Sequence, residues 1–134
     1  MRAESVLPGA GRGRVLRLAR PLSFWGGVDP ATGTITDAES GAAGRSLAGT
    51  ILMLSATRGS SSSSAVMLEL VARGCAPAAI VLARVDAILG LGLVVAAELG
   101  HAPPPLLRLD EAAQAGFADG EEVAVGRDGA LTRV

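Results

Sequence analysis

Residues 50–73 constrain the fold more than any other part of the chain, because an apolar run, a small-residue loop and a helical pattern follow one another directly. The run Thr50-Ile51-Leu52-Met53-Leu54 predicts a buried strand. From about residue 63 to residue 73, apolar side chains recur at the spacing of one helix face, and Gly74 stands where a helix commonly ends. The segment therefore predicts a strand, a loop and a helix in that order.

The loop between this strand and this helix is the first candidate site. It reads Ala56-Thr57-Arg58-Gly59 and continues with five serines, residues 60–64. A small-residue loop that enters a helix presents free backbone N–H groups and the positive end of the helix dipole, which together suit an anion. Serine is also a favoured N-cap, and serine runs form flexible linkers. The loop alone therefore leaves a binding role and a purely structural role open.

Composition limits the class of protein. A length of 134 residues fits one domain, 1–134, and an aromatic content of 2% means that Ala, Val, Leu and Ile must build the core. A net charge of −1 without a basic stripe argues against nucleic-acid binding. Arg84 and Asp86 interrupt the most hydrophobic region, and the N-terminus lacks an apolar signal core. We therefore expect a cytoplasmic protein that binds neither nucleic acid nor membrane.

The rest of the chain alternates strand and helix patterns. The continuous apolar run 79–82 predicts a strand buried on both faces. We expect further strands at 15–19, 34–36, 106–109, 121–125 and 130–132, a short helix or turn at 86–91, and a strand or helix at 93–99. Helices between strands indicate an α/β domain with a mixed sheet or barrel.

The loop 21–33 is the second candidate site. It contains one of the two phenylalanines and the only tryptophan of the chain in the run Phe24-Trp25-Gly26-Gly27. A loop that carries bulky aromatic side chains among glycines either fills a core or lines a site. The residues themselves leave both roles open.

Four other polar residues have simpler explanations. Asp29 precedes a proline and fits an Asx-type turn, and Asp86 fits the N-cap of the following helix. Cys75 follows the end of a helix and is typical of a small packing residue, whereas His101 precedes three prolines in an expected surface loop. One Cys and one His cannot form a metal site by themselves, so we expect none in this chain.

The two candidate loops, read together, resemble those of the aconitase X swivel domain. The resemblance rests on residues 21–33 followed by Arg58-Gly59 and the serine run; residues 76–80 fit it too, and it covers nearly the whole chain. It implies a swivelling β/β/α fold, with a mixed or barrel-like sheet and flanking helices. It also implies a heterodimeric dehydratase that is inactive without its large subunit, and an iron–sulfur cluster carried by that large subunit rather than by this chain.

The resemblance also implies a mechanism. Enzymes of this kind dehydrate a hydroxy acid: iron acts as a Lewis acid on the departing hydroxyl, and a serine alkoxide of the swivel domain takes the proton. The motif places that serine directly after the loop glycine, at Ser60. Backbone N–H groups at the helix N-terminus and the Arg58 guanidinium would stabilise its anion. The substrate-binding residues expected around it are Arg58, Gly59, Ser61, Ser62, Phe24, Trp25, Gly26 and Gly27.

Two departures from the family pattern bear on the substrate. Aconitase itself has an arginine two residues after its serine, where this chain has Ser62. Family members often carry a histidine shortly after residues 34–37, whereas here the sequence is Asp37-Ala38-Glu39-Ser40. The substrate contact of that arginine must therefore differ in this chain or come from the partner, and any role of the histidine in other members is absent here.

The family resemblance leaves more than one function. The five-serine loop resembles the bacterial enzymes that convert cis-3-hydroxy-L-proline to pyrroline-2-carboxylate. The alternative is the small subunit of a mevalonate 5-phosphate dehydratase, whose phosphate would need several cations, whereas Arg58 and Arg20 are the two that this chain offers. A non-catalytic interaction module with the swivel fold and a simple anion-binding protein are the remaining alternatives.

Overall fold

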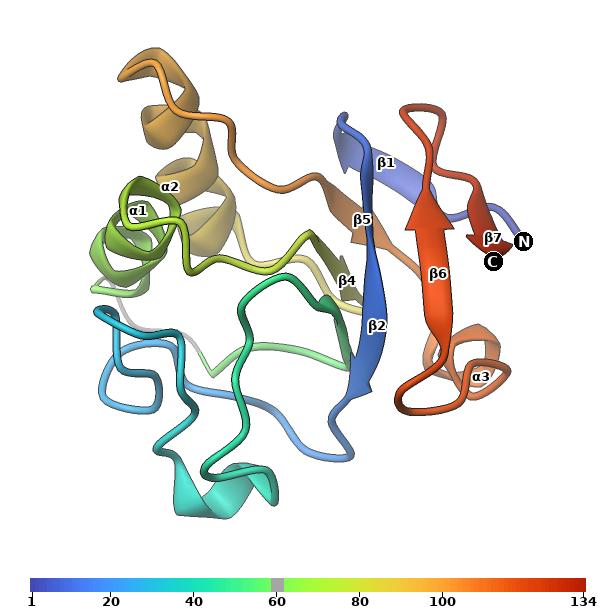
Figure 1. Cartoon of the computed structure of the whole chain (residues 1–134), viewed down its shortest axis with the longest axis horizontal. Helices are drawn as coiled ribbons and strands as arrows, with labels where there is room; N and C mark the ends of the chain where they lie inside the picture. Colours follow the sequence, from blue (N-terminus) through green and yellow to red (C-terminus); the bar gives the residue numbers. More distant parts are fainter. Residues whose placement is uncertain (59–61) are drawn as a thin grey trace.

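The computed structural model describes residues 1–58 and 62–134, and these form a mixed sheet of seven strands with its two longer helices together on one side (Figure 1). The strands are β1 (Glu4–Leu7), β2 (Gly11–Arg17), β3 (Ile51–Leu54), β4 (Ala79–Leu82), β5 (Leu106–Arg108), β6 (Glu122–Val125) and β7 (Leu131–Arg133). The helices are α1 (Ser63–Ala72), α2 (Ala87–Glu98) and α3 (Glu111–Gln114), with a 3₁₀ turn at Ala38–Ser40.

The sheet has a parallel centre and antiparallel edges. Its order is β1-β5-β4-β3-β2-β6-β7; the strands from β2 to β5 pair in parallel, whereas β1, β6 and β7 pair antiparallel to their neighbours. The sheet also curls toward closure, because the Ala3 N–H donates to Gly129 O (2.9 Å) and the Leu131 N–H donates to Met1 O (2.8 Å). The expected mixed, barrel-like sheet is thereby confirmed.

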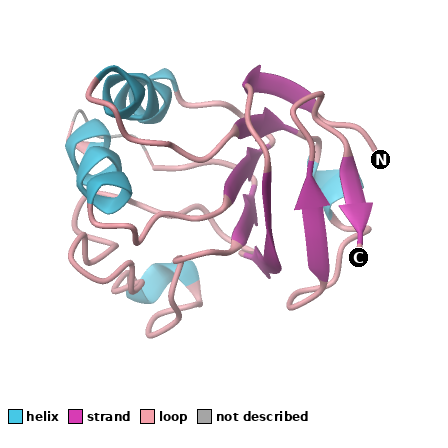
Figure 2. Ribbon diagram, turned by 45° about the horizontal axis from the view of Figure 1, so that its top comes forward, coloured by secondary structure: helices cyan, strands magenta, loops and turns pink. Residues whose placement is uncertain are grey.

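The central strands are buried on both faces, as predicted for 79–82. Leu52 and Leu54 of β3 join the core beneath α1 and α2, whereas Ile51 and Met53 join a second core inside the curled sheet. The strand β4 alternates in the same way. Figure 2 shows α1 and α2 together on one side of the central strands, away from β6 and β7 at the end of the sheet. Two cores therefore hold the central strands in place.

The structure corrects several expected boundaries. The strand β2 begins at Gly11 rather than Val15, because Gly11 and Gly13 permit close backbone contact: a Cβ on Gly13 would lie 2.1 Å from Gly49 O. Of residues 34–36, expected as a strand, Thr34 and Ile35 form only isolated bridges. Residues 87–98 form one helix, and β1 and α3 were not predicted.

The helix α2 has no charged residue before Glu98, so its apolar pattern lacks the polar stripe that usually identifies a surface helix. Asp86 begins it as predicted: its Oδ1 accepts from the Ile88 N–H at 2.9 Å. In the described parts of the chain, no helix has the length and apolar character needed to cross a membrane.

Gly92 sets how closely α2 packs against α1. A Cβ placed on Gly92 would lie 2.6 Å from the backbone oxygen of Ser64, in the first turn of α1. A Cβ on Gly90, two residues earlier in the same helix, would meet only the Leu106 side chain at an ordinary 3.7 Å. The absence of a side chain at residue 92 therefore brings α2 onto the N-terminal turn of α1.

We predict that Gly92→Ala and Gly90→Ala have opposite effects on stability. The first should lower the free energy of unfolding by about 1–3 kcal/mol, because backbone must move to admit the methyl group. The second should leave it unchanged or raise it by up to about 1 kcal/mol, because alanine favours a helix over glycine. Urea denaturation followed by circular dichroism measures both, and equal effects would contradict this view of the α1–α2 contact.

Candidate functional site

The two candidate loops lie against each other. The serine loop, residues 56–64, follows the carboxyl end of β3, and its Thr57 forms a parallel bridge with Leu22 of the aromatic loop, residues 21–33. The Arg58 N–H donates to Leu22 O at 2.8 Å. Thr57 is also fixed from the other side, since its hydroxyl donates to Asp86 Oδ2 at 2.9 Å, and Asp86 caps α2. The start of the serine loop is therefore held by the aromatic loop and by α2 together.

The aromatic loop makes a tight turn that only glycine permits. Gly26 has a φ of +78°, and a Cβ on Gly27 would lie 2.1 Å from Ser23 O. The backbone oxygen of Gly27 accepts from the N–H groups of Thr36 (2.8 Å) and Asp37 (3.1 Å). The turn is thus bonded to the segment that leads into the 3₁₀ helix.

The two aromatic side chains of this loop have different environments. Phe24 is completely buried in the core beneath α1 and α2, whereas Trp25 is 59% exposed. The Phe24 side chain therefore anchors the loop, and it is not accessible to a ligand in this structure. The expected substrate contacts of the aromatic loop then depend on Trp25, Gly26 and Gly27, for which they stay a prediction.

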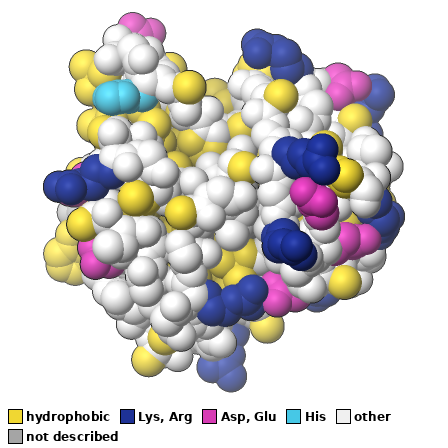
Figure 3. Space-filling view, viewed as in Figure 1, with side chains coloured by type: hydrophobic (Ala, Val, Ile, Leu, Met, Phe, Trp, Pro, Cys, Tyr) yellow, Lys and Arg dark blue, Asp and Glu magenta, His cyan; other side chains and the backbone are white. Residues whose placement is uncertain are grey.

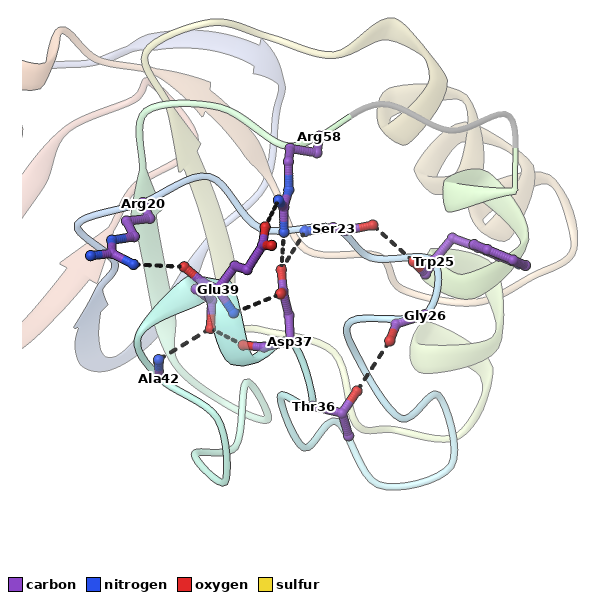
Figure 4. A network of polar contacts seen from close by, with 10 residues as sticks. Arg20, Ser23, Trp25, Gly26, Thr36, Asp37, Glu39, Ala42 and Arg58 are labelled. Atoms are coloured by element: carbon purple, nitrogen blue, oxygen red, sulfur yellow. Dashed lines mark hydrogen bonds and ion pairs between the residues drawn. The ribbon is translucent and has the colours of Figure 1, made fainter.

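Arg58 has two carboxylate partners. Its Nη2 pairs with Asp37 Oδ2 and its Nη1 pairs with Glu39 Oε2 (Figure 4). The Asp37 side chain is 10% exposed, whereas that of Glu39 is 76% exposed. The guanidinium that we expected to face a substrate anion is therefore already neutralised within the chain. Sequence reasoning missed both carboxylates as partners of Arg58.

Hydrogen bonds favour the ionised form of Asp37. Burial works to raise the pKa of Asp37, but hydrogen bonds from the Arg58 guanidinium and from the N–H groups of Glu39 and Ser23 outweigh it, so the pKa lies below its usual value. The same ion pairs, with Glu39 first and Asp37 second, raise the pKa of Arg58. At neutral pH, Asp37 is therefore a carboxylate bound to a cation.

The predicted base lies outside the described residues. Gly59, Ser60 and Ser61 are all in this part of the chain, so their predicted roles stay predictions. Ser62 is the N-cap residue of α1. Ser63, at the first position of α1, has a completely buried hydroxyl with no hydrogen-bond partner among the residues described. A buried hydroxyl without a hydrogen bond is uncommon in folded proteins, so the one at the N-terminus of α1 calls for an explanation.

Asp29, Cys75 and His101 lie in the environments that the sequence predicted for them. Asp29 Oδ1 accepts from the Ala31 N–H at 2.9 Å in an Asx-type turn. Cys75 is partly buried and packs against the core, and His101 is exposed. Within residues 1–58 and 62–134, no group of three or more His, Cys, Asp or Glu side chains is arranged to hold a metal ion.

Comparison with known proteins gives one consistent result. The family described as the aconitase X swivel domain matches residues 1–133. The chain is 42% identical over 108 residues to a cis-3-hydroxy-L-proline dehydratase of Pseudomonas aeruginosa, covering 81% of this chain but only 19% of that enzyme. It is 41% identical over 96 residues to the phosphomevalonate dehydratase small subunit of Thermococcus gammatolerans, covering 72% of this chain and 73% of that subunit.

A solved structure supports the same relationship. The crystal structure of Thermococcus kodakaraensis aconitase X in its holo form superposes with a TM-score of 0.86 at 30% sequence identity. The superposition covers 99% of this chain and 96% of that one. The curved sheet and the two helices beside the candidate loops are therefore features that both structures share.

We predict that the Asp37 ion pair makes stability depend on pH. The pKa of Asp37 is lower in the folded chain than in the unfolded chain, so the stability that it contributes is complete above about pH 5 and disappears as pH falls through the folded pKa. Asp37→Asn should therefore lose less stability than the parent chain between about pH 7 and pH 3. Urea denaturation at both pH values tests this, and equal losses would contradict it.

Proposed function

Because this chain belongs to the aconitase X swivel domain family, we propose that it is the small subunit of a two-subunit hydro-lyase that dehydrates cis-3-hydroxy-L-proline. The observation that carries the proposal is the junction of the two family motifs: the Arg58 N–H donates to Leu22 O, so the serine loop begins directly against the aromatic loop. A substrate beside the N-terminus of α1 would meet both loops.

The proposed reaction removes water from neighbouring carbons. The Ser60 alkoxide takes the proton from the carbon next to the carboxylate, the C–H electrons form the new double bond, and the hydroxyl leaves the adjacent carbon. The resulting cyclic enamine tautomerises to pyrroline-2-carboxylate. The N–H groups at the start of α1, with the positive end of its dipole, would lower the cost of holding the serine as an anion.

We place the iron–sulfur cluster of this enzyme in the large subunit. Bound there, it would supply a Lewis acid for the departing hydroxyl. The described residues of this chain include Cys75 as a partly buried packing residue and no cluster of metal ligands. The task of this chain is then to hold the base and to position the substrate.

The exposed surface of α2 supports a protein partner. Its outward-facing apolar side chains and that of the following residue, Leu99, are between 37% and 64% exposed, and they are Ile88, Leu91, Val94 and Leu99. Figure 3 shows hydrophobic side chains gathered over this helical side of the molecule, whereas most of the arginines in that view lie over the strands. Exposed apolar patches of this kind mark protein–protein contacts. The patch therefore favours a subunit of a complex over an enzyme that acts alone.

The charges around Arg58 favour the imino acid over the phosphorylated alternative. A phosphate needs cations that are not already paired. Arg58 is bound to Asp37 and Glu39, and Arg20 lies at 3.5 Å from the backbone oxygen of Glu39, so the same turn holds both arginines. The archaeal relatives motivate the alternative, a phosphomevalonate dehydratase. If this chain were part of such an enzyme, the large subunit would have to supply the cations that bind the phosphate.

The first experiment is a dehydration assay of this chain co-purified anaerobically with its large subunit. We expect turnover of cis-3-hydroxy-L-proline, and a loss of about 10²–10⁴-fold in kcat for Ser60→Ala, the range that a general base supplies. Ser5→Ala is the matched control, because Ser5 is an exposed residue of β1.

Other outcomes of this assay separate the alternatives. Turnover of mevalonate 5-phosphate instead would keep the base and reject the proposed substrate. No turnover of either compound by a cluster-loaded complex would reject the proposed function and leave a different hydroxy acid or the non-catalytic interaction module. Full activity of Ser60→Ala would reject the base assignment alone.

A further inference from the structure

One carboxylate connects three separate segments of the chain. Asp37 Oδ1 accepts from the Glu39 N–H at 3.0 Å, and Oδ2 accepts from the Ser23 N–H at 3.5 Å and from the Arg58 guanidinium (Figure 4). Ser23 belongs to the aromatic loop, and Arg58 is the last described residue before the predicted base. Asp37 therefore contacts both loops of the candidate site.

The surrounding backbone is built to bring Asp37 this close. A Cβ placed on Gly27 would lie 2.9 Å from the Asp37 Cβ, so any larger residue would push the two apart. The Gly27 oxygen also accepts from the Asp37 N–H. The Ser23 hydroxyl donates to Trp25 O at 2.8 Å, which continues the network to the exposed tryptophan. Displacement of Asp37 would therefore be transmitted to Trp25.

The contacts of Asp37 exclude a proton-transfer role. Its pKa is lowered, and its oxygens are already engaged by a guanidinium and two backbone N–H groups, so it is a poor proton acceptor at neutral pH. These contacts instead fix the positions of the two side chains, because a nearly buried carboxylate bound to a guanidinium restricts the orientation of both groups.

We propose that Asp37 is a positioning residue of the hydro-lyase, which sets the aromatic loop and the start of the serine loop at a fixed distance through Ser23 and Arg58. The inference rests on the proposed function, because the distance matters for turnover only if substrate lies between these loops. It assigns to Asp37 a role distinct from that of Glu39, although both carboxylates bind the same guanidinium.

Glu39 is the internal comparison that the structure offers. Its side chain is 76% exposed and, within residues 1–58 and 62–134, makes no hydrogen bond to the aromatic loop, so its ion pair with Arg58 resembles the exposed pairs that contribute little. Asp119 is the second comparison. It accepts from the Arg17 N–H (2.9 Å) and pairs with Arg45 (2.9 Å), which repeats the contacts of Asp37 in a different part of the fold.

The test compares Asp37→Asn, Glu39→Gln and Asp119→Asn in the complex with the large subunit. We expect Asp37→Asn to lower kcat by about 10–100-fold with a smaller change in KM, since misplacement of catalytic groups by about 1 Å costs up to about 10²-fold. The two control variants should stay within about 3-fold of the parent, because exposed pairs of this kind contribute little. In an Arg58→Ala background, Asp37→Asn should have a much smaller effect, because its action passes through Arg58.

A second readout does not depend on activity. Trp25 is the only tryptophan, so the fluorescence of the isolated chain reports on the aromatic loop alone. We expect Asp37→Asn to change the acrylamide quenching of Trp25 while circular dichroism shows a folded protein, and we expect Asp119→Asn to leave the quenching unchanged.

The outcomes separate failure of the inference from failure of the proposed function. If the parent complex turns over neither substrate, the proposed function fails, and with it the catalytic part of this inference; unchanged Trp25 quenching would then remove the loop contact as well. If the parent complex is active and Asp37→Asn matches it in kcat, Asp37 is not a positioning residue. An equal loss of kcat in Asp119→Asn would also overturn the inference, because general destabilisation would then explain both.

Discussion

The burial of β3 on both faces is the constraint on which the rest of this structure depends. Its side chains alternate between the core beneath the helices and the core inside the curled sheet, so neither its register nor its direction can change without exposing one set. Because β2, β3 and β4 run in parallel, their carboxyl ends lie at the same edge of the sheet. The loop that follows β3 therefore starts from a fixed position, close to where the chain leaves β2 for the aromatic loop.

The sequence predicts those elements whose pattern is strong within a few residues. The strands at 50–54 and 79–82 are continuous apolar runs, and the helix before Gly74 has helical spacing and a glycine with a φ of +72° at its end. The strand β1 was missed because it is a short edge strand that is mostly exposed, so no apolar alternation identifies it. The first half of β2 was missed because Gly11 and Gly13 have no side chain to show a strand pattern, and they serve a close approach between strands that only tertiary structure creates.

In the candidate site, too, local features were predicted from the sequence and contacts between distant residues were not. Both loops were found from composition, since a lone tryptophan among glycines and a cation before five serines are conspicuous locally. The two carboxylate partners of Arg58 were not found, because Asp37 and Glu39 lie 21 and 19 residues away and meet it only in the folded chain. The sequence signal that could have suggested them is an Asx turn: Asp37 precedes Glu39 by two residues and accepts from its N–H. The burial of Phe24 likewise follows from tertiary packing.

The curled sheet brings the two ends of the chain to one place. Met1 O accepts from the Leu131 N–H, and Figure 1 shows both termini beside β7, on the side of the molecule away from α1 and α2. A covalent tether at either end would thus leave from the strand edge and not cross the candidate loops. The same fold can then stand as a separate chain or be joined to another domain through a linker, which raises the effective concentration of one beside the other.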